Sequence, residues 1–257
     1  MVRPKKFLGQ HFLKDQNIAS KIVEALILPQ ELSQVVEIGP GTGVLTQFLT
    51  EKKNIELTLI EIDRESVAYL KEKFPTLTPR LVEGDFLELD LQKLIAGDFH
   101  IIGNFPYNIS SQIFFKALEH RNQVKQIVCM LQKEVADRIA EKEGSKTYGI
   151  LSVLLQAYYD IQYLFKVPPG VFHPPPKVMS AVIRLTRNNR ITLGCDEVLF
   201  QKVVKQGFQN RRKTLRNALK PLNLPASVSL LPIMEKRAEQ LSVEQFISLT
   251  QLIEKGR

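Results

Sequence analysis

Short apolar runs alternate with amphipathic stretches through the first half of the chain. Five runs have the length and β-branched content of buried strands: QVVEIG (34–39), ELTLIEID (56–63), RLVEGD (80–85), FHIIGN (99–104) and VKQIVCML (124–131). Apolar residues recur at helical spacing between them, for example over residues 65–74 and 110–120. This alternation predicts an α/β fold whose mostly parallel, doubly wound, Rossmann-like sheet has helices on both faces.

The pattern changes beyond residue 157. Residues 158–167 and 178–185 alternate between apolar and polar positions, and the loop PPGVFHPPP (168–176) between them is rich in proline. We expect these two strands to form an antiparallel hairpin that closes the sheet. After residue 190 the chain becomes helical and basic. We therefore predict two domains: the α/β domain over 1–190, which includes a basic N-terminal segment, and a small all-α domain over 191–257.

Positive charge is concentrated near the two ends of the chain. The formal net charge is +8, and residues 191–257 hold 11 basic residues against 6 acidic ones. Residues 202–220 contain seven basic residues and no acidic one, and four basic residues precede the first acid, Asp15. Two basic clusters indicate a polyanionic partner, for which we favour nucleic acid over a merely solvated helix face.

The composition also argues against membrane, secretion and metal functions. No apolar run approaches the roughly eighteen residues of a membrane span, and the basic N-terminus lacks the apolar stretch of a secretion signal. Because Cys129, Cys195 and the four histidines have no metal-ligand spacing, we expect no metal and a reducing, cytoplasmic location. Nothing in the pattern predicts an obligate dimer, so we expect a monomer.

The loop VVEIGPGTGVL (35–45) places Gly39, Gly41 and Gly43 directly after a strand and before a helix. Glycines in such a loop permit positive φ angles and a close approach of the backbone to a ligand. The spacing differs from the G-x-G-x-x-G of dinucleotide sites, and no Lys-Ser/Thr follows as in a phosphate-binding P-loop. The loop therefore predicts a nucleotide-like ligand, with only a weak indication of NAD and no P-loop.

Two acids stand at the ends of the next two strands. Glu61 is placed to accept hydrogen bonds from both ribose hydroxyls, and Asp85 to accept one from an adenine amino group. Open α/β sheets bind ligands at the carboxyl ends of their strands, so we expect both acids near the glycine loop. A glycine loop with acceptors for a ribose and an adenine fits S-adenosylmethionine better than a phosphate-rich cofactor.

The segment IIGNFPYNIS (101–110) ends the fourth strand on Asn-Phe-Pro-Tyr. Methyl transfer to an exocyclic amine requires that the amine become nucleophilic and point at the sulfonium methyl. The Asn104 side-chain oxygen and the Phe105 backbone carbonyl can accept the two amino hydrogens, and Tyr107 can stack on the base. Orientation and electrostatics then supply the rate without a general base. Phe172 is our candidate for the second face of the base, although packing in the core explains it equally well.

Seven segments, in this order, resemble the KsgA/Erm family of ribosomal RNA adenine dimethyltransferases, which are class I SAM-dependent methyltransferases: KKFLGQHFLKD, EIGPGTGVLT, EID, EGDFLELD, GNFPYNISS, FHPPPKVMSAV and QNRRKTLRNAL. The resemblance covers nearly the whole chain. The glycine loop alone is shared with many methyltransferases, whereas the combination of GQHFL, NFPY and FHPPPKV is specific. The segment RRKTLRNAL is more similar to the KsgA-type, small-subunit enzymes than to the Erm type.

This resemblance implies an activity and a partner. The enzyme would transfer four methyl groups from S-adenosyl-L-methionine to N6 of two adjacent adenosines in the 3′-terminal hairpin of small-subunit (16S) rRNA. The substrate would be an assembling 30S-type particle, so the reaction would belong to ribosome biogenesis. The α/β domain would bind the cofactor and carry out catalysis, and the helical domain would bind RNA.

The resemblance also implies three sets of contacts. Cofactor contacts would come from Gln10, His11, Leu13, Gly39, Gly41, Glu61, Asp85 and Asn104. The target adenine would lie against Asn104, Tyr107 and Phe172. RNA phosphates would lie against Arg211, Arg212, Lys213 and Arg216, unless some of these pack the helical domain instead. Phe105 departs from the family, which usually has a smaller aliphatic residue there, and this affects only the expected fit around the base.

Three other functions stay open on the sequence. An Erm-type enzyme would methylate adenine N6 in large-subunit (23S) rRNA. A DNA adenine methyltransferase would share the Asn-x-Pro-Tyr chemistry. A non-catalytic ribosome-assembly factor would bind immature subunits without methylating them.

Overall fold

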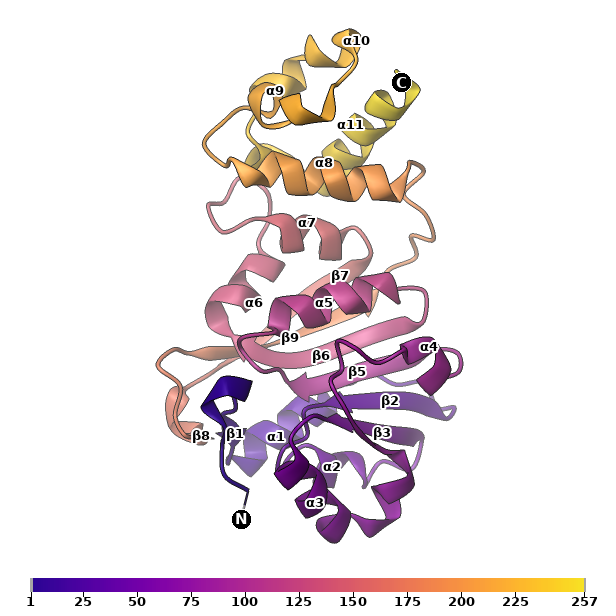
Figure 1. Ribbon diagram of the computed structural model, residues 1–257, viewed down its shortest axis with the longest axis vertical. Coiled ribbons are helices and arrows are strands. Elements are labelled where there is room, and N and C mark those ends of the chain that lie inside the picture. Colours follow the sequence, from indigo (N-terminus) through magenta and orange to yellow (C-terminus); the bar gives the residue numbers. More distant parts are fainter. Residues whose placement is uncertain (1, 257) are drawn as a thin grey trace. The chain divides into compact units, whose positions relative to one another are not determined.

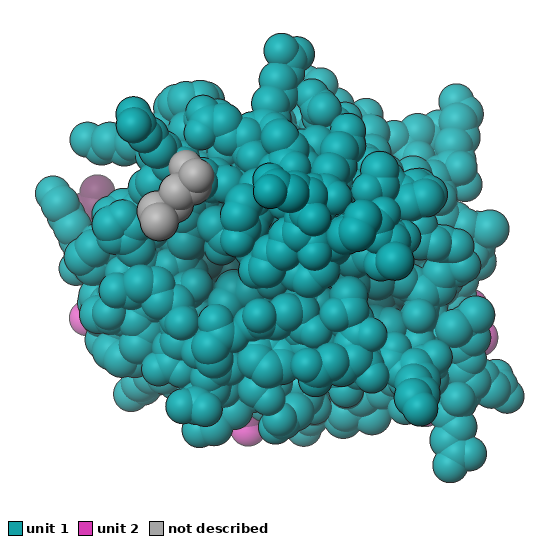
Figure 2. Space-filling view, turned by 90° about the horizontal axis from the view of Figure 1, so that it is seen from below, with its two compact units in different colours: residues 1–136, 161–187 teal, residues 137–160, 188–257 magenta. Residues whose placement is uncertain are grey.

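The structure, a computed structural model, describes residues 2–256, and the chain divides into two compact units (Figures 1 and 2). The first unit comprises Met1–Ala136 and Ile161–Arg187, and the second comprises Asp137–Asp160 and Asn188–Arg257. Residues 137–160, which the sequence pattern places in the α/β domain, thus group with the C-terminal helices. The domain boundary at residues 190–191 stays a prediction.

A seven-stranded sheet forms the centre of the first unit, in the order β4-β3-β2-β5-β6-β9-β7 (Figure 1). Its strands are β2 (Ser33–Ile38), β3 (Ile55–Glu61), β4 (Leu81–Glu83), β5 (Phe99–Asn104), β6 (Val124–Gln132), β7 (Tyr159–Val167) and β9 (Ser180–Arg187). The pairs among β2 to β6 are parallel, and β9 is antiparallel to β6. The predicted α/β fold, with its antiparallel hairpin at the end of a mostly parallel sheet, is confirmed.

The order of the strands identifies where this sheet can bind a ligand. From β2 the chain proceeds outward through β3 to β4, and then returns to the other side of β2 with β5 and β6. The strand order therefore reverses between β2 and β5, and a crevice opens at the carboxyl ends of strands on either side of such a reversal.

Helices follow the start signals expected from the sequence. Those that begin within the first unit are α1 (Gln16–Glu24), α2 (Thr46–Leu49), α3 (Arg64–Lys73), α4 (Leu91–Leu94), α5 (Ser110–Glu119) and α6 (Lys133–Ala140), with short 3-10 helices at η1 (Lys6–Leu8), η2 (Pro75–Arg80) and η3 (Pro169–Val171). Asp15 caps α1 by accepting a hydrogen bond from the Ile18 N–H at 3.0 Å. The apolar face of α1, with Ala19, Ile22 and Val23, packs in one core with central strand residues such as Ile102 and Val128.

A second, two-stranded sheet was not expected from the sequence. Strand β1 (Phe12–Leu13) pairs antiparallel with β8 (Phe172–His173), and the Lys14 N–H donates to the Val171 carbonyl at 2.8 Å. Leu13 and Phe172 lie opposite each other in the register, and both side chains are buried in the core of the first unit. This pairing joins the N-terminal segment to the proline-rich loop 168–176, and two residues per strand are too few for a sequence pattern to predict it.

The second unit is helical. It contains α7 (Ile150–Gln156), α8 (Glu197–Gln209), α9 (Leu215–Ala218), α10 (Ala226–Ser229) and α11 (Val243–Lys255), with 3-10 helices η4 (Lys220–Leu222), η5 (Pro232–Glu235) and η6 (Ala238–Gln240). Helix α8 packs against α7, α9 and α11, and Phe208 contacts the rings of both Tyr148 and Phe246. The predicted helical C-terminal region is thus confirmed. No helix within residues 2–256 combines the length and apolar character that a membrane crossing requires.

Candidate cofactor and substrate pocket

A cavity of about 260 Å³ lies in the first unit, where the carboxyl ends of β4, β3, β2 and β5 meet the N-terminal segment. It is lined by Leu8, Gly9, Gln10, His11, Phe12, Ile38, Gly39, Gly41, Ile60, Glu61, Ile62, Gly84, Asp85, Phe86, Asn104, Phe105, Pro106, Tyr107, Asn108 and Ile109. These residues come from five separate stretches of the chain. Two walls can be distinguished: a strand-end wall, which follows β2 to β5, and an N-terminal wall, which is Leu8–Phe12.

Most of the residues selected from the sequence for the cofactor and the base line this cavity. They are Gln10, His11, Gly39, Gly41, Glu61, Asp85, Asn104 and Tyr107. Leu13 and Phe172 are not among the lining residues, because they pair across β1 and β8 and are only 3% and 1% exposed. The structure therefore does not bring these two side chains to the cavity, and their contacts with the cofactor and the base stay predictions.

Gly39 and Gly41, in the loop after β2, are required to be glycine for different structural reasons. Gly39 has a φ of +64°, and a Cβ atom there would meet nothing within 4 Å, so its missing side chain leaves cavity space open. Gly41 has a φ of +58°, and a Cβ atom there would lie 2.8 Å from Cε1 of the Phe12 ring. Gly39 therefore provides room for a ligand, whereas Gly41 provides room for the N-terminal wall.

Glu61 is buried at the end of β3, and the backbone holds both of its carboxylate oxygens. Oε2 accepts from the Gly41 N–H at 2.9 Å, and Oε1 accepts from the Asp63 N–H at 2.9 Å. Burial raises the pKa of Glu61, and these donations offset the increase only in part. A carboxylate that already orders the glycine loop has further lone pairs, with which it can accept hydroxyl donors from the cavity.

A second buried acid, Glu37, was missed by the sequence analysis. It lies on β2, is 1% exposed, and accepts a hydrogen bond from the Thr46 hydroxyl at 2.7 Å. Burial raises its pKa to about 8, and the nearby charge of Glu61 adds to the increase. The run VVEIG does not reveal that Glu37 is buried, because an acid within an apolar strand can equally well lie at the exposed end of that strand. Burial thus raises the pKa of both neighbouring carboxyls, Glu37 and Glu61.

Asn104 and Tyr107 are both held by residues distant in sequence. The Asn104 amide nitrogen donates to the His11 carbonyl at 2.8 Å, which leaves its oxygen as the group available to accept. The Tyr107 hydroxyl hydrogen-bonds with Ser180 Oγ at 2.5 Å, and its ring stacks with that of His11 at a centroid distance of 5.2 Å. Burial raises the pKa of Tyr107, so the phenol stays protonated at neutral pH. One face of Tyr107 is thus occupied by His11.

The Phe105 side chain belongs to the core. Its ring is 1% exposed and meets the ring of Phe114 edge to face at 5.7 Å. The Phe105 N–H donates to the Met130 carbonyl at 2.9 Å, which continues the β5–β6 ladder by one residue. The aromatic side chain at this position therefore fills space behind the strand end, and the backbone of Phe105 is what lines the cavity.

Several lining residues escaped the sequence analysis because they are apolar. Ile62, between Glu61 and Asp63, is 47% exposed and lines the cavity, as do Phe12 and Phe86. The sequence feature that could have identified Ile62 is an isoleucine between two acids at the end of a strand, where an apolar side chain can serve as a contact surface.

Lys116 was also missed, although it supports the same wall. It is mostly buried on α5 and donates to the carbonyls of Leu87 at 2.9 Å and Leu89 at 2.5 Å. Its ammonium group also lies 5.5 Å from the centre of the Phe86 ring. The helix after Asn104 therefore fixes the loop that carries Asp85 and Phe86.

The four basic residues predicted to meet RNA lie in the second unit, and all four are exposed. The Arg211 guanidinium donates to the Tyr148 carbonyl and lies 5.8 Å from the centre of the Phe208 ring, so part of its role is structural. Arg216 forms an ion pair with Glu235 at 2.5 Å. Arg212 and Lys213 have no side-chain partner within residues 2–256.

A cavity of about 380 Å³ adjoins this region and is lined by Arg216, Asn217, Lys220, Asn223, Leu224 and Ser229.

Comparison with known proteins gives one consistent result along the whole chain. The family model described as "Ribosomal RNA adenine dimethylase" matches residues 1–255. The "Ribosomal RNA small subunit methyltransferase A" of Parabacteroides distasonis is 58% identical over 256 residues, which cover 99% of this chain and 96% of that protein. The protein of the same name from Cytophaga hutchinsonii is 57% identical, with 98% of each chain covered.

Two solved structures share the fold over nearly the full length. A dimethyladenosine transferase from Plasmodium falciparum is similar with a TM-score of 0.74 and 26% identity, covering 93% of this chain and 96% of that one. The 23S rRNA methyltransferase ErmE is similar with a TM-score of 0.68 and 24% identity, covering 93% of this chain and 99% of that one. At that identity, the second likeness concerns the fold alone.

Proposed function

The chain belongs to the ribosomal RNA adenine dimethylase family, and from this premise we propose that it methylates N6 of two adjacent adenosines in the 3′-terminal hairpin of small-subunit (16S) rRNA. The methyl donor is S-adenosylmethionine, and the product is N6,N6-dimethyladenosine. Relatives that are 58% and 57% identical over almost their whole length bear the name of a small-subunit methyltransferase. The observation that carries the proposal is the meeting of the glycine loop, two acids and Asn104–Tyr107 around one cavity.

The lining residues fit S-adenosylmethionine. Glu61 has lone pairs for the ribose hydroxyls, and Asp85 has one oxygen left for the adenine amino group, because its Oδ1 accepts the Leu87 N–H at 2.8 Å. Ile62 and Phe86 offer apolar surface for the adenine ring, and the open side of Gly39 leaves room for the amino-acid portion. When bound, this cofactor supplies an electrophilic methyl group on a sulfonium sulfur. Gln10, His11, Leu13, Gly41 and Asn104 complete the proposed binding set.

The target adenine is held by the residues that follow β5. Asn104 Oδ1 and the Phe105 carbonyl accept the two hydrogens of the exocyclic amine, which makes its lone pair available for attack. Tyr107 stacks on the base with the ring face that His11 leaves free, and Phe172 is the residue that we propose for the other face of the base. These residues orient the amine and stabilise the charge that develops on it, so no general base is required.

RNA is held by charge in the second unit. Arg212 and Lys213 are exposed and have no side-chain partner within residues 2–256, and Arg211 and Arg216 lie beside them. Such residues contact phosphates and position the substrate without reading its sequence. We place the enzyme in the cytoplasm as a monomer that acts on an assembling 30S-type particle during ribosome biogenesis.

Labelled methyl transfer tests this proposal. Small and large ribosomal subunits and duplex DNA, all from cells that lack this modification, are incubated with the protein and labelled S-adenosylmethionine. The labelled RNA is then digested to nucleosides. We expect label in the small subunit alone, recovered as N6,N6-dimethyladenosine near the 3′ end. Label in the large subunit or in DNA, or binding to subunits with no transfer, would contradict the proposal.

A further inference from the structure

Most of the N-terminal wall of the cavity is not held by a sheet. Leu8–Phe12 contribute five consecutive lining residues, yet only Phe12 belongs to a strand. The backbone hydrogen bonds donated by residues 8–10 are local, from Leu8 and Gln10 to the Lys5 carbonyl and from Gly9 to the Lys6 carbonyl. The rest of this wall is fixed against the first unit at His11, whose carbonyl accepts from the Asn104 amide at 2.8 Å and whose ring stacks on Tyr107, and by side chains near its start.

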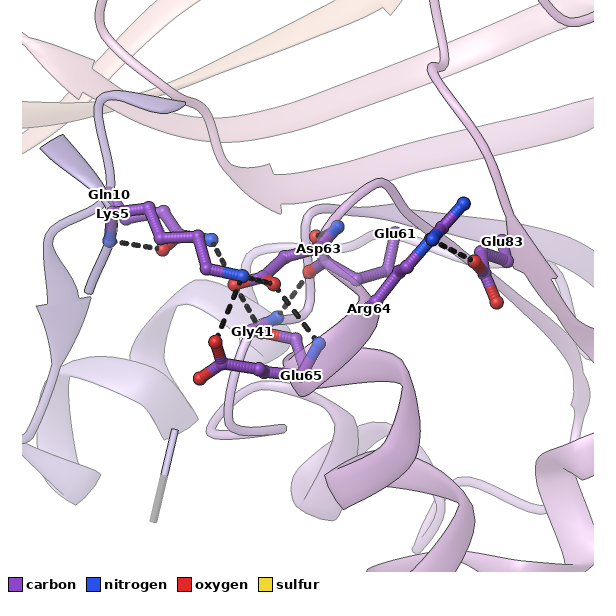
Figure 3. A network of polar contacts seen from close by, with 9 residues as sticks. Lys5, Gln10, Gly41, Glu61, Asp63, Arg64, Glu65 and Glu83 are labelled. Carbon is purple, nitrogen blue, oxygen red and sulfur yellow. Dashed lines mark hydrogen bonds and ion pairs between the residues drawn. The ribbon is translucent and has the colours of Figure 1, made fainter. Parts of the chain in front are cut away.

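Asp63 receives two of these side chains. Its Oδ1 accepts from the Lys5 ammonium, and its Oδ2 accepts from the Gln10 amide nitrogen at 3.0 Å (Figure 3). The Gln10 amide oxygen in turn accepts from the Lys5 N–H at 2.8 Å, and Glu65 lies 3.3 Å from the Lys5 ammonium. Asp63 thus ties both ends of the segment 5–10 to the turn that follows β3.

The Asp63 carboxylate is well suited to this task. Its side chain is fully buried and also caps α3 by accepting from the Glu65 N–H at 3.1 Å. Burial raises the pKa of Asp63, but the hydrogen bonds from Lys5 and Gln10 outweigh burial and hold the pKa below its usual value. Removing one partner of a buried charged pair leaves the other charge uncompensated, so the clasp is costly to open.

The same turn connects the clasp to the cofactor residues. The Asp63 N–H donates to Glu61, and Glu61 accepts from the Gly41 N–H, both at 2.9 Å (Figure 3). Phe12, at the other end of the N-terminal wall, packs so closely on Gly41 that no Cβ atom fits between them. The wall, the glycine loop and the buried acid therefore form one closed ring of contacts.

From this geometry we propose that Lys5–Phe12 is a flap over the cofactor pocket and that Asp63 is the clasp that keeps it closed through Lys5 and Gln10. Asp63 is a positioning residue, because it acts on the cofactor through the flap and through Glu61. The identity of the ligand rests on the proposed function, whereas the closure of the flap does not. Opening releases Lys5 and Gln10 from Asp63 and exposes one side of the cavity.

The variants Asp63→Asn and Lys5→Met test the clasp. Each removes one charge, and Asp63→Asn keeps the shape of the helix cap. Asp90→Asn is the control for the first variant, because Asp90 also caps a helix and also pairs with a lysine, Lys93, but is exposed and has no hydrogen bond or ion pair with residues 5–12 in the described part of the chain. Arg64→Met is the control for the second, because the Arg64 ion pair with Glu83 is exposed.

The first measurement is hydrogen exchange of residues 5–12 in the ligand-free protein. We expect about 10- to 100-fold faster exchange in both clasp variants, which corresponds to the loss of one charge-assisted hydrogen bond. The double variant should exchange no faster than the faster single variant, because the two residues act through one interaction. Unchanged exchange in Lys5→Met would overturn the clasp. This test does not depend on whether Asp63→Asn folds.

The second measurement is binding of S-adenosylhomocysteine, the product form of the proposed cofactor. We expect the dissociation constant to rise about 10- to 100-fold in the clasp variants and to stay unchanged in the controls. The KM for S-adenosylmethionine should rise in parallel, while kcat at saturating cofactor stays near that of the unchanged enzyme. A fall in kcat with unchanged KM would overturn the positioning role. If the protein without any substitution binds neither S-adenosylhomocysteine nor S-adenosylmethionine, the proposed function is contradicted. The hydrogen-exchange result on the flap would still stand.

Discussion

The two walls of the pocket are built by different means. The strand-end wall consists of residues at or just beyond the carboxyl ends of four parallel strands, so the backbone ladder of the sheet places Gly39, Glu61, Asp85 and Asn104. The N-terminal wall consists of a segment placed mainly by side chains, through Lys5, Gln10, the contact of Phe12 with Gly41 and the hydrogen bond from Asn104 to the His11 carbonyl, with only Phe12 in a two-stranded sheet. A wall fixed by a ladder tolerates the loss of one side chain, whereas a wall fixed by a few side chains moves as a unit when one of them is lost.

This difference predicts that a change in the strand-end wall alters chemistry without moving the wall. Asn104→Ala removes the proposed acceptor for the adenine amine, and we expect kcat to fall by about 100- to 1000-fold. S-adenosylhomocysteine affinity should fall far less, because Glu61 and Asp85 remain in place. Single-turnover methyl transfer and equilibrium binding measure the two effects. Asn122→Ala, in an exposed turn, is the control, and a rate near that of the unchanged enzyme would contradict the role of Asn104.

A change outside both walls should leave the pocket intact. Replacing Arg211, Arg212 and Lys213 with Gln removes three charges from the second unit, and we expect RNA affinity to fall by at least about tenfold at physiological salt. The slope of log affinity against log salt should become shallower by about 2. S-adenosylhomocysteine binding should not change. An unchanged salt slope would contradict the role of these residues in RNA binding and leave only the contacts of Arg211 with Tyr148 and Phe208.

The contact between the two walls can be broken at Gly41. Gly41→Ala places a Cβ atom 2.8 Å from the Phe12 ring, at a φ of +58°. We expect a loss of about 1–3 kcal/mol in S-adenosylhomocysteine binding, since strain and a displaced flap act together. Gly97→Ala is the matched control, because Gly97 also has a positive φ, of +77°, but has no atom within 4 Å of its missing Cβ.

A second substitution identifies which cause dominates at Gly41. Phe12→Ala in the Gly41→Ala background removes the clash and should restore part of the binding, as measured by the same titration. If it restores nothing, the backbone conformation of the glycine loop accounts for the loss, and the two walls are not coupled at this point.

The last prediction concerns the stability of the fold and Glu37, the buried acid of β2. Its pKa of about 8 in the folded protein lies above the usual 4.5, so the folded state binds the extra proton between these values. The free energy of unfolding should therefore decrease as pH rises from about 5 to 8, by at most about 1.4 kcal/mol per pH unit from this group. Glu37→Gln should flatten that dependence. Denaturant titrations at pH 6, 7 and 8 measure it, and an equal slope in both proteins would show that Glu37 is charged throughout.

The comparison of the walls also explains how far the sequence could predict the structure. The strand-end wall follows from local patterns, because a strand of known direction and the residue after it are both visible in QVVEIG, ELTLIEID and FHIIGN. The N-terminal wall depends on contacts over 50 to 160 residues, between Lys5 and Asp63 and between β1 and β8. No periodicity encodes such pairs, and family resemblance alone drew attention to Gln10 and His11.

The burial of individual side chains was the second property that the sequence could predict only in part. The sequence identifies Leu13 and Phe172 as residues of interest, and packing in the core was one of two explanations for Phe172, but it does not show that the two residues pair. It likewise gives no sign that Lys116 is buried with two carbonyl partners, since a lysine in a helix is ordinarily solvated. Whether such a side chain is buried depends on the space left between helices and strands, and that space depends on the packing of the complete fold.

The pairing of β1 with β8 has a consequence for the order in which the molecule is completed. Leu13, which directly follows the N-terminal wall, cannot find its neighbour until Phe172 has been translated, about 160 residues later. Asp63 can be reached much earlier. The N-terminal wall therefore has its second anchor only after about 110 further residues beyond Asp63 have been made, and the nascent chain becomes competent to retain a small molecule only after most strands of its sheet exist.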